Sequence, residues 1–225
     1  MVVPKSRYSN MHKASLWHQD WFPPVAVSGP EQMAVLKPVS LSEIPIKTAA
    51  FSRIPKSETA SEVLAHGYVG DERLAGLYRD PSKYLDDFSR YGAVVCPDFS
   101  MHRHMPRHER VRSSWASRAV GAYFQTHGLK VVPNVRWGFV EDLSFVLDGL
   151  PQTSAIAVST QTLRRNARSM TILRDGLRVV MKELQPEGVL LYGSAPNSIL
   201  ELLDRHATIR QVPTDIARVF HKRDV

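Results

Sequence analysis

The sequence contains a single cysteine, Cys96, among its 225 residues. One cysteine cannot form an internal disulfide, so a disulfide-based scaffold is excluded. Cys96 lies inside the apolar stretch AVVCP, where we expect a buried and unreactive thiol. No apolar run approaches the roughly 20 residues that a transmembrane helix needs, and the N-terminus lacks the charged-then-apolar pattern of a signal peptide. We therefore expect a cytoplasmic protein that does not bind membranes.

Several common catalytic signatures are also missing. The sequence has no GxxxxGK(S/T) phosphate loop, no GxGxxG after a predicted strand, no CxxC pair, no HExxH helix and no GxSxG elbow. ATPase, dinucleotide-binding and zinc-protease functions are therefore unsupported. The sequence indicates no particular cofactor.

Histidines are dense in the stretch MHRHMPRH, which contains His102, His104 and His108. Such density is typical of metal ligands. Here Pro106 interrupts the spacing, no cysteine is nearby, and the surrounding arginines disfavour a bound cation. We therefore predict no metal site.

Acidic residues are outnumbered, with 22 Asp and Glu against 29 Lys and Arg and a formal net charge of +7. This balance favours an anionic ligand or a nucleic acid as partner. The same arginines also fit ordinary solvated helix faces. If they contact nucleic acid, the residues expected to do so are Arg103, Arg107, Arg110 and Arg118.

The chain divides into two parts by its pattern. Residues 1–45 are rich in proline and have little periodicity, which predicts an irregular N-terminal arm. Residues 46–225 are expected to form a single α/β domain, because short apolar strands alternate with helical patterns. Such strands predict a largely parallel sheet flanked by helices, either barrel-like or doubly wound. The strands expected in it include 93–97, 130–135, 154–158 and 188–192, with helices at 106–128, 163–184 and 214–223.

Polar side chains gather where the predicted strands end, and in both architectures ligands bind at these carboxyl ends. Asp98 is the candidate catalytic residue, as a general base or, alternatively, a metal ligand, and Arg136 is a candidate clamp for a carboxylate or phosphate. A structural alternative is that Asp98 forms turn hydrogen bonds, Arg136 pairs with Glu141 or Asp142, and Tyr192 only packs. The predicted substrate-binding residues are Ser100, Asn134, Arg136, Trp137, Ser159, Thr160, Tyr192, Gly193 and Ser194.

Four stretches of the chain resemble a known family: CPDFSMHRHMP, RAVGAYFQTHGLKVVPNVRWG, FVLDGLPQTSAIAVST and VLLYGSAP. The family is an uncharacterised domain of unknown function that is frequent in phages, prophages and other bacterial mobile elements. The similarity covers about residues 60–200. It implies a phage-like setting, in which nucleic-acid transactions are common, and it implies no reaction, substrate or catalytic residue.

Two functional hypotheses follow. The first is an enzyme that acts on a phosphorylated, nucleotide-like or nucleic-acid substrate at the strand ends, with Asp98 as acid or base. The second is a non-catalytic nucleic-acid-binding accessory protein that uses an arginine cluster, which consists of Arg103, Arg107, Arg110 and Arg118. Replacing Asp98 with Asn distinguishes them, because it abolishes an activity in the first case and leaves binding intact in the second.

Overall fold

The structure is a computed structural model that describes residues 21–51, 58–160 and 167–214. Within these ranges, seven strands run parallel and follow one another across two sheets in chain order. The first sheet contains β3 (Lys47–Ala50), β4 (Val63–His66), β5 (Ala93–Val95) and β6 (Val131–Val132). The second contains β7 (Ala155–Ser159), β8 (Gly188–Tyr192) and β9 (Thr208–Val212).

The two sheets adjoin between β6 and β7. Asn134 forms a parallel bridge with Ala157. The Val135 amide donates to the Ala157 carbonyl and the Ala157 amide donates to the Pro133 carbonyl, both at 2.8 Å. The parallel arrangement therefore continues from one sheet to the next, and the predicted α/β fold with a largely parallel sheet is confirmed.

The combined sheet is strongly curved. Three strands lie between β4 and β8, so in a flat sheet these two would be about 19 Å apart at about 4.8 Å per strand. Yet the rings of Tyr68, just after β4, and Tyr192, at the end of β8, are stacked with centroids 4.2 Å apart. The consecutive strand order agrees with the barrel-like alternative and not with a doubly wound sheet, whose order reverses.

The curved sheet is not a closed barrel. Over the ranges that the structure describes, β9 and β3 do not pair as strands. Arg210 of β9 instead donates hydrogen bonds to the carbonyls of Ile44 (2.8 Å) and Leu41 (3.2 Å), which precede β3. A side chain therefore bridges the gap between the two edge strands.

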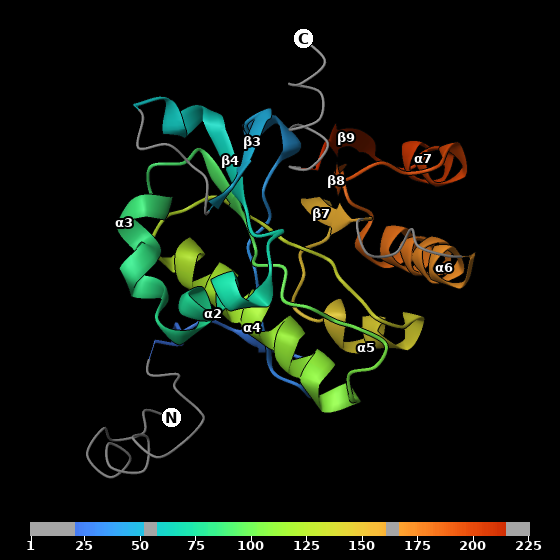
Figure 1. Ribbon diagram of the computed structural model, residues 1–225, viewed down its shortest axis with the longest axis horizontal. Helices are drawn as coiled ribbons and strands as arrows, with labels where there is room; N and C mark the ends of the chain where they lie inside the picture. The colour runs from blue at the N-terminus through green and yellow to red at the C-terminus, as the bar shows by residue number, and fades with distance from the viewer. Residues whose placement is uncertain (1–20, 52–57, 161–166, 215–225) are drawn as a thin grey trace.

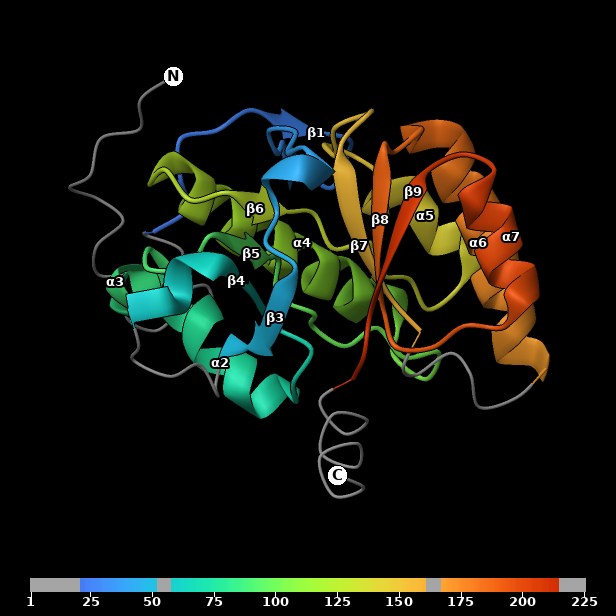
Figure 2. The same ribbon diagram turned by 90° about the horizontal axis from the view of Figure 1, so that it is seen from above.

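Helices cover the outer face of the sheet. Figure 1 shows α2 (Asp71–Arg79), α3 (Leu85–Phe88) and α4 (Arg107–Thr126) beside the first sheet, and α5 (Leu143–Val146), α6 (Ala167–Leu184) and α7 (Asn197–Asp204) beside the second. Figure 2 shows β7, β8 and β9 side by side with α6 and α7 next to them. Short 3-10 helices are η1 (Leu41–Glu43), η3 (Glu58–Glu62), η4 (Pro81–Tyr84) and η5 (Val140–Asp142).

The helices pack closely because of their sequence pattern. In α6, Leu173, Leu177, Val180 and Leu184 recur at helical spacing and are all buried. In α4, Gly121 faces the sheet, where an added Cβ would meet the Cys96 sulfur at 2.3 Å. The expected helix at 163–184 is observed from Ala167, and its first residues lie outside the described ranges. Residues 215–223 of the expected helix at 214–223 also lie outside them. Helix α2 was not predicted.

The concave face of the sheet is filled rather than hollow. Apolar side chains of successive strands form one buried cluster there, which includes Leu64, Val95, Val132, Ala157 and Leu190. This packing resembles the filled interior of a parallel barrel. It leaves the carboxyl ends of the strands as the place where polar side chains gather.

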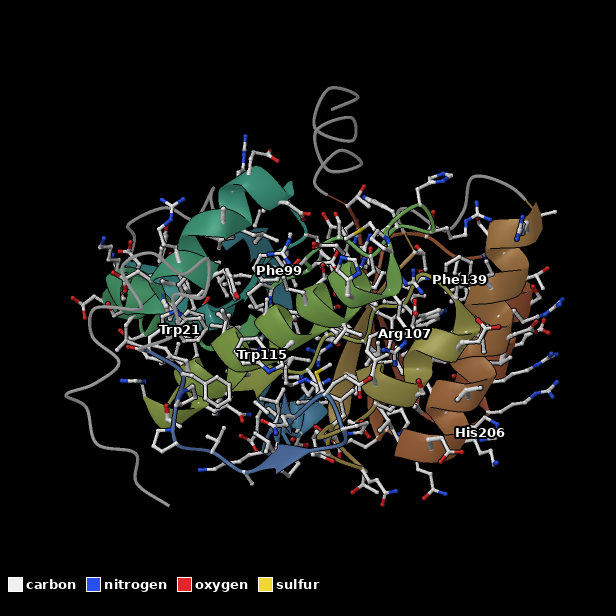
Figure 3. All side chains as sticks on the ribbon, turned by 90° about the horizontal axis from the view of Figure 1, so that it is seen from below. Trp21, Phe99, Arg107, Trp115, Phe139 and His206 are labelled. Carbon is white, nitrogen blue, oxygen red and sulfur yellow. The ribbon has the colours of Figure 1, made fainter. Side chains whose placement is uncertain are left out.

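The described part of the N-terminal arm packs on the body. Its hairpin of β1 (Val27–Ser28) and β2 (Met33–Ala34) is antiparallel, and Met33 and Ala34 are at most 1% exposed. Trp21 contacts the rings of Tyr78 and Tyr123 edge-on, on the side of the molecule that also carries Trp115 (Figure 3). The arm therefore contributes to the core, which its lack of periodicity did not indicate. The domain boundary at residue 45 stays a prediction.

Candidate functional site

A continuous chain of polar contacts links the carboxyl ends of β4, β5 and β6. The Tyr68 hydroxyl donates to Asn134 Oδ1 at 3.1 Å. The Asn134 Nδ2 group donates to Asp98 Oδ1 at 2.8 Å, and Arg136 Nη1 donates to the other carboxylate oxygen, Asp98 Oδ2. Both oxygens of Asp98 therefore accept hydrogen bonds, and the amide of Asn134 is held in one orientation by its two partners.

Local backbone geometry explains why the side chains of Asn134 and Arg136 both contact Asp98. Successive side chains of an extended chain point to opposite faces, so residues 134 and 136 share one face. Val135 and Trp137 point the other way and join the core cluster next to α6. This alternation separates Arg136 from its neighbour Trp137.

Trp137 is therefore a core residue. Its side chain is 2% exposed, and its indole N–H donates to the Ile172 carbonyl of α6 at 3.2 Å. Gly176 makes room for the ring, since an added Cβ there would lie 2.3 Å from the indole nitrogen. This placement corrects the expectation that Trp137 binds substrate.

Two tyrosines and a histidine form an aromatic wall beside the polar chain. The rings of Tyr68 and Tyr192 are stacked at an interplanar angle of 17°. The ring of His66, the last residue of β4, lies 4.8 Å from that of Tyr192 and 5.4 Å from that of Tyr68. Tyr192 and His66 are each 2% exposed, whereas Tyr68 is half-buried. Tyr68 therefore joins the aromatic wall to the Asp98 contacts.

Burial dominates the electrostatics of the site. It raises the pKa of Asp98, and the nearby Asp71 carboxylate adds to this, while the Arg136 guanidinium and the Asn134 amide oppose it. Burial and the charge of Asp98 raise the pKa of the Tyr68 phenol well above its usual range. Tyr68 is therefore a neutral hydrogen-bond donor. Among the residues linked by these polar contacts, Asp98 is the group that can exchange a proton.

Ser159, Thr160 and Gly193 lie at the ends of β7 and β8. Ser159 is in register with Tyr192 and is half-buried. Thr160 is fully buried, and its hydroxyl lies 3.3 Å from the Tyr192 carbonyl and 3.0 Å from the Ser194 carbonyl. The Gly193 amide donates to the Val212 carbonyl at 2.8 Å. Thr160 thus holds the turn after β8, and the Gly193 amide is already used by a neighbouring strand.

The remaining predicted residues, Ser100 and Ser194, lie at the edge of the site. The backbone amide and the hydroxyl of Ser100 each donate to Asp71 Oδ1 at 3.1 Å. Ser194 is exposed. The structure therefore brings Asp98, Asn134, Arg136 and Tyr192 together, and places Ser100 on the N-terminus of α2 instead. A role in binding stays a prediction for all of them.

The arginine cluster does not form one cationic face. Arg118 is 3% exposed and donates to the carbonyls of Asp148 (2.6 Å) and Val146 (2.8 Å), and burial lowers its pKa to about 10. Because a buried guanidinium cannot reach an external phosphate, the expectation that Arg118 contacts nucleic acid is corrected.

The other arginines of the cluster are separated by their partners. Arg110 has only 11% of its side chain exposed and donates to both oxygens of Asp142 at 3.0 Å. Arg107 pairs with Glu31 at 2.7 Å and lies next to α5 (Figure 3). Arg103 is half-buried. Arg107 and Arg110 therefore point to different neighbours, which weakens the cluster as a nucleic-acid interface.

The described residues carry no excess charge. Ten of the 29 Lys and Arg residues and three of the 22 Asp and Glu residues fall outside the described ranges, which leaves 19 of each. Over the same ranges, no three metal-ligating side chains gather closely enough to hold a metal ion, and no helix is long and apolar enough to cross a membrane. Any surface of the described residues that has an excess of positive charge must therefore be confined to one part of the molecule.

Sequence reasoning missed two residues of this site, Tyr68 and His66. The sequence VLAHGYVG of residues 63–70 predicts one strand, whereas β4 ends at His66 and Tyr68 belongs to the following loop. Gly67 is the residue of this stretch that could have indicated the end of the strand. It allows close approach, since an added Cβ there would lie 3.1 Å from Pro97 Cα. A glycine in a strand pattern often marks such an approach.

The chain belongs to a protein family described as a domain of unknown function (DUF4417), whose family model matches residues 29–211. The Gene 1 protein of Mycobacterium phage L5 is 32% identical over 128 residues, which cover 57% of this chain and 56% of that protein. The Gene 1 protein of Mycobacterium phage D29 is also 32% identical over 128 residues, covering 57% of this chain and 47% of that protein. The matched region thus spans about half the length of these phage relatives. No solved structure matches the chain.

Proposed function

We propose that the carboxyl ends of β4, β5, β6 and β8 form a site for a small anionic substrate, phosphorylated or nucleotide-like. In this site Asp98 acts as general acid and base, and Arg136 binds the anionic group. The observation that carries the proposal is the unbroken chain of contacts from Tyr68 through Asn134 and Asp98 to Arg136. It lies at the edge of the sheet where parallel α/β folds bind their ligands.

Asp98 has the properties of an acid–base group. A general acid or base works best when its pKa lies close to the working pH, and burial moves the pKa of Asp98 upward from its acidic range. Its two donors fix the carboxylate plane, and Tyr68 fixes Asn134 in turn. Proton transfer at Asp98 therefore requires little rearrangement of the surrounding side chains.

Arg136 has the properties of an anion clamp. Its planar guanidinium matches the geometry of carboxylates and phosphates, and 15% of the side chain is exposed. A bound phosphate competes with Asp98 for this cation. Loss of a cationic partner raises a carboxyl pKa, so anion binding at Arg136 favours protonation of Asp98.

The aromatic wall supports a substrate with a planar ring. Tyr68 is stacked on Tyr192 on one side and remains half-buried. Aromatic side chains of this kind stack on nucleobases in nucleic-acid-binding proteins, with about 1–3 kcal/mol per base. Among phosphorylated compounds, nucleotides therefore fit the site best.

The proposal is tested by comparing binding and conversion of substrate. The full chain is incubated with a mixture of nucleoside phosphates and sugar phosphates, and bound and converted compounds are identified by mass spectrometry. Asp98→Asn preserves shape and is expected to retain a bound compound but to lose its conversion. Thr171→Ala, at an exposed position of α6 away from the strand ends, serves as control and keeps both.

Conversion by Asp98→Asn at the rate of the unmodified chain would remove Asp98 as the acid–base group. Binding without conversion in both proteins would favour the second candidate class, a non-catalytic binding protein. For that class, Arg107, Arg110 and Arg118 are poor carriers of nucleic-acid binding because of their buried or paired guanidiniums. The groove between α6 and α7, whose lining is rich in Arg and Lys, suits nucleic acid better.

A further inference from the structure

A groove of about 860 Å³ runs between α6 and α7, on a different surface from the strand-end site. Its lining is rich in cations: α6 contributes Arg174, Arg178 and Lys182, and the residues after α7 contribute Arg205 and His206. Figure 3 shows His206 where the two helices lie side by side. Glu201 is the acidic residue of the lining. Because the described residues are neutral in sum, this is a local concentration of positive charge.

The three α6 cations are accessible and weakly held. Their side chains are 46%, 62% and 83% exposed in chain order. Arg174 and Arg178 approach Asp175 at 3.4 and 3.2 Å, and Lys182 approaches Glu183 at 3.5 Å. Exposed ion pairs of this kind contribute about 0–1 kcal/mol. A phosphate can therefore displace these carboxylates with little loss.

The spacing of the cations matches a phosphate backbone. Arg174, Arg178 and Lys182 are four residues apart, so they lie on one stripe of α6. At about 1.5 Å of rise per residue the stripe spans about 12 Å. One strand of a DNA duplex carries a charge about every 3.4 Å along the axis, so the stripe spans three to four phosphates.

The lining also indicates which polyanion fits. It contains no Phe, Tyr or Trp, and its apolar members are Met181 and Leu202. Single-stranded nucleic acids are usually held by aromatic stacking platforms, and protein interfaces are enriched in aromatic residues. Phosphates of a duplex are contacted mainly by Arg and Lys. We propose that the α6–α7 groove binds the phosphate backbone of duplex nucleic acid without reading its sequence.

The test is fluorescence anisotropy of the full chain with a labelled duplex of about 20 base pairs, long enough to span the stripe. Binding is measured from about 50 to about 200 mM salt, where counterion release has a large effect. The groove variant is Arg174→Gln/Arg178→Gln/Lys182→Gln. Its matched control, Arg79→Gln/Lys83→Gln/Arg112→Gln, removes the same charge from exposed positions on α2, η4 and α4. Circular dichroism confirms that both are folded.

Each phosphate contact contributes about −0.9 to the slope of log affinity against log salt, so the groove variant is expected to reduce the slope by about 2 to 3. The control triple leaves the slope nearly unchanged. Asp175→Asn, which frees Arg174 and Arg178 from their carboxylate, is expected to raise the affinity. Scrambling the duplex sequence has no effect.

Three results would overturn the proposal. One is equal loss of affinity in the groove and control triples, which would show a general charge effect. Another is the absence of duplex binding at low salt. The third is displacement of the duplex by polyglutamate at equal charge concentration, which would assign the groove to an acidic protein. None of these outcomes bears on the strand-end site, because the groove uses none of its residues.

Discussion

Replacing Arg136 with Met removes the cation from a buried ion pair and leaves Asp98 in the site. Asp98 is 8% exposed, and 15% of the Arg136 side chain is exposed, so water screens the pair poorly. Removing one partner of a buried pair costs about 3–5 kcal/mol because the remaining charge is uncompensated. We expect a loss of this size in the free energy of unfolding at pH 8.

The loss depends on pH with a defined sign. Burial already raises the pKa of Asp98, and in the variant Arg136 no longer opposes this effect. When the pKa of a carboxyl group is raised in the folded state, its contribution to the free energy of unfolding is fully present below the unfolded pKa of about 3.9. This contribution is lost as the pH rises through the folded pKa. The variant therefore recovers stability on acidification, by about 1.4 kcal/mol per pH unit while folded Asp98 is protonated and unfolded Asp98 is ionised.

Urea denaturation at pH 5 and pH 8 measures both effects. The double variant Asp98→Asn/Arg136→Met is the reference, because it lacks the titrating group and is expected to lose the extra pH dependence. Its destabilisation at pH 8 is expected to be smaller than the sum of the two single variants, since the two residues interact. An equal loss at both pH values, or additive single effects, would refute the buried pair.

Three further predictions concern the packing of the fold. Burial raises the pKa of the Cys96 thiol to about 11, so at pH 8 only about one thiol in a thousand is ionised, and Ellman's reagent is expected to react with Cys96 only after unfolding. Gly176→Ala places a Cβ against the Trp137 indole and is expected to cost about 1–3 kcal/mol in urea denaturation, whereas Thr171→Ala at an exposed position of α6 costs little. Arg118→Met leaves the buried Val146 carbonyl and the partly buried Asp148 carbonyl without their donor and is expected to destabilise by about 2 kcal/mol or more. The salt dependence of duplex binding is expected to stay unchanged, and a change in its slope would show that Arg118 contacts the duplex.

Strands β5, β6, β7 and β8 were predictable because each is short and apolar on both faces, which is characteristic of a parallel sheet covered by helices. The rule that polar residues at strand ends converge then led to Asp98, Asn134 and Arg136, and the structure brings these three into contact. Both inferences depend on local patterns that burial imposes on the sequence.

The errors came from properties that local pattern does not determine. Arg136 and Trp137 are adjacent in the sequence, yet alternation sends one to the site and the other to the core. Arg118 has the same side chain as the exposed Arg107 and Arg112 of α4, and only the packing of that helix on the residues around Asp148 buries it. The curvature that brings Tyr68 onto Tyr192 depends on the whole sheet.

The most direct measurement of the central claim is the set of small molecules that the protein retains. The full chain and its Arg136→Gln variant are exposed to a mixture of phosphorylated metabolites, passed through gel filtration and analysed by mass spectrometry. We predict that the unmodified chain and the α6 triple variant retain a phosphorylated compound, and that Arg136→Gln does not. Equal retention by Arg136→Gln, or no retention by the unmodified chain, would contradict an anion site at the carboxyl ends of the strands.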